Sequence, residues 1–148
     1  MYLEIKGKYG EQRSGRKYMT TWMKIKPIAY WIATLMLVSE TAVGAFWDIL
    51  KVPSSRDVII HLGYPEYMLL ILGIWKLLAV IVLLIPRFPL FKEWAYAGIF
   101  FEFSGAIASH IAKGDGFSAW SVAAIFVLIE IISWVLRPAS RKLVRQQT

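Results

Sequence analysis

The chain has 148 residues, of which 57% are hydrophobic and 18% are charged, and its mean hydropathy is +0.53. This composition excludes a disordered chain and an ordinary soluble protein, and the length suits one domain. The sequence contains no cysteine, so it can form no disulfide and can supply no thiolate for redox chemistry or for a metal.

Four apolar windows of about 20 residues follow one another along the chain. They cover residues 28–50, 66–85, 93–112 and 117–136, and each is long enough for an α-helix to cross a hydrocarbon core of about 30 Å. We therefore predict an all-α membrane protein. Its transmembrane domain, residues 28–137, is an up-down-up-down bundle of four helices, flanked by basic tails at residues 1–27 and 138–148.

The segments outside the windows predict how the helices begin and how they follow one another. Residues 1–26 are polar and basic, so we expect most of them to be poorly ordered and Pro27 to start the first helix. The link 86–92 holds two prolines and the link 113–116 is a tight glycine turn. Links this short make the helices on either side antiparallel neighbours.

The connection at residues 51–65 is the longest link between windows. Ser54 and Ser55 are candidate caps for a short helix that begins at Arg56 and ends at Gly63. The apolar stripe of this helix would rest at the outer membrane interface.

Thirteen of the 17 basic residues lie on one side of the predicted membrane, close to the ends of the windows. The opposite side holds only Lys51, Arg56 and Lys113. This asymmetry follows the positive-inside rule and predicts a multi-pass protein of the cell membrane with both termini in the cytoplasm. The formal net charge of +7 therefore indicates the lipid bilayer, and not nucleic acid, as the partner. The basic residues of the predicted cytoplasmic side are Lys6, Lys8, Arg13, Arg16, Lys17, Lys24, Lys26, Arg87, Lys92, Arg137, Arg141, Lys142 and Arg145.

Each window carries one ionisable residue near its middle: Glu40, Lys76, Glu102 and Glu130. A charge at the centre of a bilayer costs about 2.5–3.5 kcal/mol, so we expect these four side chains to face one another inside the bundle. Lys76 can neutralise one carboxylate, and the other acids must hold or share a proton or meet an external cation. An ion path, a ligand pocket and a structural network all fit this pattern, and it assigns no catalytic residue.

A second group of polar residues lies toward the predicted outer surface: Asp48, His61, Ser109, His110 and Asp115. Charged residues at helix ends normally reach interfacial water, and a histidine near a helix C-terminus gains stability from the helix dipole. No His-x3-His spacing is present, so we expect no metal site. The sequence also shows no phosphate-binding glycine loop and no nucleic-acid motif.

One face of the third window combines its central acid with small residues at helical spacing, a pattern that predicts close helix approach. The residues of this face are Ala95, Gly98, Glu102, Gly105, Ala106 and Ser109.

Several phrases of the chain resemble the DoxX-like family of small four-helix membrane proteins. They are LGYPEY at 62–67, LGIWKL at 72–77, KEWAYAG at 92–98, Pro86-Arg87, Gly105-Ala106, Ser109-His110, Ser133-Trp134 and Arg137-Pro138. The wider group includes a subunit of a thiosulfate:quinone oxidoreductase, membrane partners in bacterial thiol-oxidative stress defence, and eukaryotic assembly factors. The resemblance therefore implies the fold and leaves the activity open.

Three functions are compatible with these observations. The first is an accessory or small-molecule-binding membrane subunit that works with a protein partner or as a homo-oligomer and is not a catalyst on its own. The second is a membrane subunit of a quinone-linked oxidoreductase, with a quinone bound between helices and the acids exchanging its protons. The third is a small proton-coupled carrier that uses Glu40, Glu102 and Glu130, and it has the least support because no window is interrupted.

Overall fold

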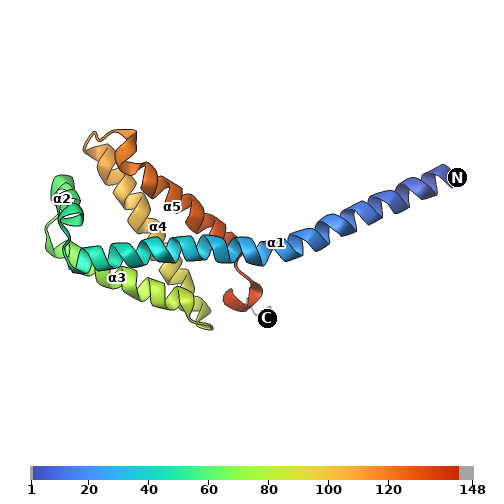
Figure 1. Cartoon of the computed structure of the whole chain (residues 1–148), viewed down its shortest axis with the longest axis horizontal. Helices are drawn as coiled ribbons and strands as arrows, with labels where there is room; N and C mark the ends of the chain where they lie inside the picture. The colour runs from blue at the N-terminus through green and yellow to red at the C-terminus, as the bar shows by residue number, and fades with distance from the viewer. Residues whose placement is uncertain (1, 144–148) are drawn as a thin grey trace.

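The structure is a computed structural model that describes residues 2–143, with side chains described for residues 23–143. Its described part is built from helices alone and contains no strand, which confirms the predicted fold class (Figure 1). In chain order the elements are α1 (Tyr2–Ile49), α2 (Pro53–Leu62), α3 (Tyr67–Leu84), α4 (Pro89–Ala112), α5 (Phe117–Leu136) and a short 3-10 turn, η1 (Ala139–Arg141).

The four long helices form an up-down-up-down bundle in which α1 packs against α3 and α5, and α4 packs against the same two helices. Helices α1 and α4 therefore occupy diagonal corners. Segments Met23–Ile49, Tyr67–Leu84 and Phe117–Leu136 are long and apolar enough to cross a membrane. Helix α4 carries more charge, but its 24 residues span about 36 Å. The chain is a multi-pass membrane protein.

The surface of the bundle is apolar, as a lipid-facing surface requires. Large side chains such as Trp75, Phe101 and Leu128 are exposed on it, whereas several hydroxyl and charged side chains, among them Thr34 and Glu130, are buried. In the interior, Tyr96 donates a hydrogen bond to Ser133, Ser133 donates one to Thr34, and Thr34 donates one to the Tyr30 carbonyl. Each oxygen–oxygen distance is 2.7 Å. Such chains satisfy buried polar groups where no water is at hand.

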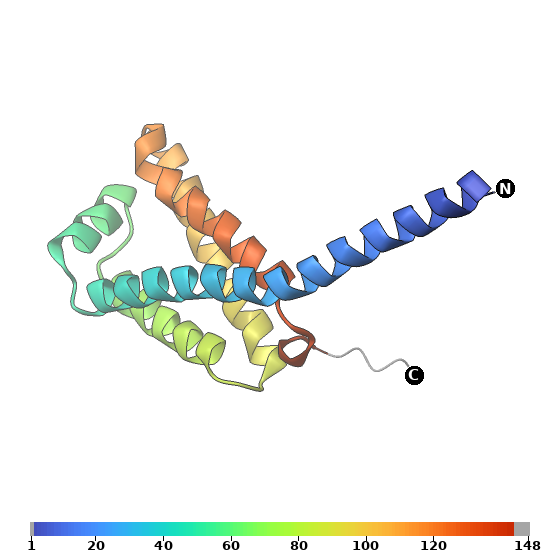
Figure 2. The same cartoon turned by 45° about the vertical axis from the view of Figure 1, so that its right-hand side comes forward.

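Helix α1 begins at Tyr2, so the prediction that the first helix starts at Pro27 is wrong. A proline inside a helix removes one backbone hydrogen bond and bends the axis, but it need not end the helix. The N-terminal part of α1 projects beyond the other helices (Figures 1 and 2).

Helix α2 lies across one end of the bundle, which we call the α2 end; the 113–116 turn lies at the same end (Figure 2). The helix starts at Pro53 with Val52 before it, and no side chain caps it, so the predicted serine caps are wrong. A proline at the first helical position already has the favoured φ and lacks only a donor that would be unpaired there. Gly63 ends α2 with a φ of +89°, as predicted.

The opposite end of the bundle, which carries the 85–88 connection and η1, is closed by buried basic side chains. Lys92 is 1% exposed and donates to the carbonyls of Val82 and Leu83 in the last turn of α3 and to that of Ile85, the residue after it, at a distance of 2.6 Å. These carbonyls have no partner within the helix, so the lysine caps its C-terminus.

Candidate functional site

Lys76 on α3 is the centre of the polar interior. Its Nζ lies 2.7 Å from Asp48 Oδ2 on α1 and 2.8 Å from Glu102 Oε1 on α4. Gly44 leaves room for this side chain, because a Cβ at that position would lie 3.2 Å from Nζ. Two acids share one base, and all three side chains are largely shielded from solvent.

The structure brings Lys76 and Glu102 together, as expected, but it places Asp48 where the sequence pattern placed Glu40. Glu40 is half-buried and takes part in no hydrogen bond or ion pair among the described residues. Glu130 is 2% exposed, and neither of its carboxyl oxygens has a hydrogen-bond partner in the described part of the chain.

The sequence pattern missed the pairing of Asp48 with Lys76 because the position of a residue along its helix does not show how far a long side chain from another helix reaches. Asp48 follows Glu40 by two helical turns, about 12 Å, but a lysine side chain can cover much of that distance. Gly44, four residues before Asp48 and on the same face of α1, is the signal that could have indicated room for a lysine.

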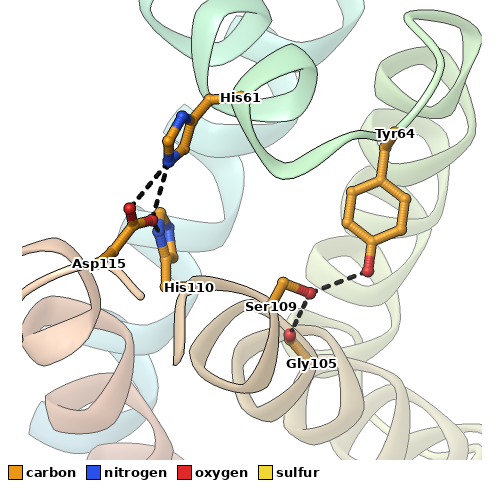
Figure 3. Close-up of polar contacts among 6 residues, drawn as sticks. All are labelled: His61, Tyr64, Gly105, Ser109, His110 and Asp115. Carbon is orange, nitrogen blue, oxygen red and sulfur yellow. Dashed lines mark hydrogen bonds and ion pairs between the residues drawn. The ribbon is translucent and has the colours of Figure 1, made fainter. Parts of the chain in front are cut away.

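At the α2 end, Asp115 in the turn after α4 accepts hydrogen bonds from two histidines (Figure 3). His110 Nδ1, from α4, lies 2.7 Å from Oδ2, and His61 Nε2, from α2, lies 2.9 Å from Oδ1. These hydrogen bonds, that of His110 first, lower the pKa of the Asp115 carboxyl. The group therefore joins α2 to the α4–α5 turn through a carboxylate.

A second link at the α2 end joins Tyr64 to Ser109 (Figure 3). The Ser109 hydroxyl donates a hydrogen bond to the Gly105 carbonyl, so its oxygen accepts the hydrogen bond of the Tyr64 hydroxyl. Both oxygen–oxygen distances are 2.8 Å. The sequence pattern predicted that Asp48, His61, Ser109, His110 and Asp115 lie toward the outer surface. In the structure the last four lie at the α2 end, whereas Asp48 pairs with Lys76.

Two cavities meet at the Lys76–Glu102 pair. The first, of about 480 Å³, opens under α2, and we call it the α2-end cavity; its lining includes Trp47, Asp48, Tyr64, Lys76, Glu102 and His110. The second, of about 690 Å³, lies between α3 and α4, and we call it the lateral cavity; its lining includes Trp75, Lys76, Trp94, Gly98, Phe101 and Glu102. Leu72, Lys76, Phe101 and Glu102 line both.

The small face of α4 therefore has a different role from the one predicted. A Cβ added at Gly98 or Gly105 would meet no atom within 4 Å, because both residues border cavities. Close helix approach occurs instead at Gly73 on α3, where an added Cβ would lie 3.0 Å from the Ala45 carbonyl oxygen on α1.

The chemistry available at this site is that of charged and hydroxyl groups next to an apolar space. Among the described residues there is no group of three or more His, Asp or Glu side chains placed to hold a metal ion. Hydrogen-bond donors, carboxylates and an imidazole line the α2-end cavity, while aromatic and aliphatic side chains form most of the lateral cavity. The arrangement suits a molecule with a polar head and an apolar tail.

Comparison with curated proteins and with solved structures found no match to this chain. Residues 32–133 match the DoxX-like family, and this stretch runs from the middle of α1 through most of α5 and includes every residue that lines the two cavities. The chain belongs to the DoxX-like family.

Proposed function

We propose that this protein is a membrane subunit that binds a small amphipathic molecule. The head group would sit beside Lys76, Asp48 and Glu102, and the tail would lie in the lateral cavity. The observation that carries this proposal is that the two cavities share the Lys76–Glu102 pair, so polar and apolar spaces meet at a charged group.

The sizes and linings of the cavities support this function. Volumes of about 480 and 690 Å³ fall in the range of small-molecule sites, about 300–1,000 Å³. A structural network would need only paired groups. Here, instead, a buried ion pair borders open space, where a ligand can reach its remaining hydrogen-bonding capacity.

A quinone is the ligand class that fits these features best. Its ring carbonyls can accept hydrogen bonds from a lysine ammonium, its ring can stack on aromatic side chains such as Phe101, and its apolar tail matches the lateral cavity. Quinone binding would make the chain a membrane subunit of a quinone-linked oxidoreductase, whose electron-transfer groups would belong to a protein partner.

The first test is mass spectrometry of the molecules and proteins that copurify with the chain in mild detergent. The second is saturable quenching of tryptophan fluorescence by decylubiquinone, since Trp47, Trp75 and Trp94 line the cavities. Gly98→Leu should block the lateral cavity and weaken quenching at least tenfold. Ala97→Leu is its matched control, because Ala97 is exposed on the same helix and lines neither cavity.

Equal quenching by the wild type and Gly98→Leu would exclude binding in the lateral cavity. If no small molecule copurifies and decylubiquinone does not bind saturably, the binding function is wrong. A copurified protein without a ligand would then favour the accessory role.

We also propose that both termini face the cytoplasm, as the basic residues at that end of the bundle suggest. Because the chain has no cysteine, single cysteines can report the topology. Cysteines at Ser55 and Gly114 should react with an impermeant maleimide added outside intact cells, and cysteines at Arg87 and Ser140 should react only after lysis. The reverse pattern would invert the orientation.

A further inference from the structure

We propose that His110 makes ligand binding depend on the redox form of the head group: a hydroxyl group binds the neutral imidazole, whereas a carbonyl group binds only with uptake of one proton. This inference rests on the proposed function, since it concerns the head group of the bound molecule. It assigns a role to the His61–Asp115–His110 bridge, which ligand binding alone does not require (Figure 3).

The position of His110 allows contact with a ligand. The residue lines the α2-end cavity, and its side chain is 12% exposed. Its Nδ1 lies 2.7 Å from Asp115, while no described residue makes a hydrogen bond with its Nε2. One ring nitrogen is thus held by the protein and the other is available to the cavity.

Asp115 determines which nitrogen carries the proton. Its lowered pKa keeps it a carboxylate, which can only accept hydrogen bonds, so Nδ1 of His110 must be the donor. A neutral imidazole has one donor and one acceptor nitrogen, and Nε2 is therefore the acceptor. This is the usual way in which a carboxylate fixes a histidine tautomer.

A head group that donates a hydrogen bond and one that only accepts therefore need different protonation states of His110. The hydroxyl of a quinol can donate to the Nε2 lone pair, and no proton enters or leaves. A quinone carbonyl can only accept, so Nε2 must first take a proton from water. The resulting imidazolium donates from Nε2 to the carbonyl and from Nδ1 to Asp115, and the proton count balances.

Charged groups face His110 from three elements of the fold. Asp115 faces it from the α4–α5 turn, and Asp48 and Glu102 line the same cavity from α1 and α4. Lys76 on α3 is the cation of the cavity, and it is already paired with both of those acids.

The outer side of the bridge connects it to water and adds a second basic group. His61 from α2 shares Asp115, and its side chain is 55% exposed, so protons can exchange with solvent there. Lys113 adds a positive charge near Gly63, at the end of α2.

The test measures binding of decylubiquinone and of decylubiquinol, kept reduced without oxygen, between about pH 5 and 8, where histidines titrate. In the upper part of this pH range, quinone affinity should fall by up to about tenfold per pH unit, because binding takes up one proton. Quinol affinity should stay constant there and fall on acidification. Calorimetry in buffers with different ionisation enthalpies should show uptake of up to one proton for the quinone and none for the quinol.

His110→Gln should abolish the difference in pH dependence between the two forms. Asp115→Asn keeps the size of the side chain but no longer fixes the tautomer of His110, so it should reduce the difference in pH dependence. It serves as the second variant if His110→Gln does not fold. Tyr67→Phe is the control, because Tyr67 is exposed and lines neither cavity, and it should leave the difference unchanged.

Two outcomes separate this inference from the proposed function. Saturable binding of both forms with the same pH dependence, or an unchanged difference in His110→Gln, would overturn the inference alone. Absence of saturable binding by either form of the wild type at every pH would overturn the proposed function.

Discussion

At Gly73, α3 lies close to α1, and we predict that Gly73→Ala destabilises the bundle. A Cβ at this position would lie 2.7 Å from Cγ1 of Ile49 and 3.0 Å from both the Ala45 carbonyl oxygen and the Ile49 backbone nitrogen. The side-chain atom can move, but the two backbone atoms can do so only if α1 shifts. Overpacking of this kind costs about 1–3 kcal/mol.

The better helix propensity of alanine offsets up to about 1 kcal/mol of this cost, so a net loss of about 1–2 kcal/mol is expected. Gly98→Ala is the matched control, because a Cβ there meets nothing within 4 Å and only the propensity gain remains. Thermal unfolding in detergent should therefore place Gly73→Ala below the wild type and Gly98→Ala at or slightly above it. Equal midpoints for both variants would show that α1 and α3 are not in close contact at Gly73.

Three further predictions concern charged groups. Lys76→Met leaves Asp48 and Glu102 without their shared cation, so it should cost about 3 kcal/mol or more at pH 7 in detergent unfolding, and acidification should restore part of the loss; an unchanged pH profile would show that Lys76 is not coupled to the acids. The pKa of the Asp115 carboxyl lies below its usual 3.8, so its hydrogen bonds to His61 and His110 stabilise the fold above pH 3.8, and this stabilisation is lost as the pH falls through the lowered pKa. Asp115→Asn should therefore be less stable than the wild type at pH 7, and its melting temperature should fall less on acidification. Lys92→Met leaves the Val82 and Ile85 carbonyls without their donor, although Arg141 still donates to Leu83, and should lower stability by about 2 kcal/mol; a wild-type midpoint would show that lipid or water replaces the lysine.

The helices could be predicted from the sequence because bilayer thickness and turn residues leave few alternatives. The windows 66–85 and 117–136 agree with α3 and α5 to within one residue, and Gly63 ends α2 as expected. The start of α1 was missed, since a proline marks a bend as well as a beginning.

The candidate site could be predicted only in part. The pattern identified Lys76 and Glu102 as interior residues, because charge is costly in lipid. It could not identify Asp48 as their partner, since that depends on the relative register of α1 and α3 and on the reach of the lysine side chain. Likewise, the glycines of α4 show that space exists beside them, but only the packing of neighbouring helices determines whether a helix or a cavity fills it.

The lateral cavity lies between exposed aromatic side chains of α3 and α4, among them Trp75, Trp94 and Phe101. A solute that enters there comes from the hydrocarbon phase and never has to cross the aqueous boundary layer. Occupancy would then follow the mole fraction of that solute in the bilayer, and its bulk concentration would matter only through partitioning. Diluting a proteoliposome suspension with buffer would leave the bound fraction nearly unchanged, whereas fusing the same vesicles with empty lipid would lower it.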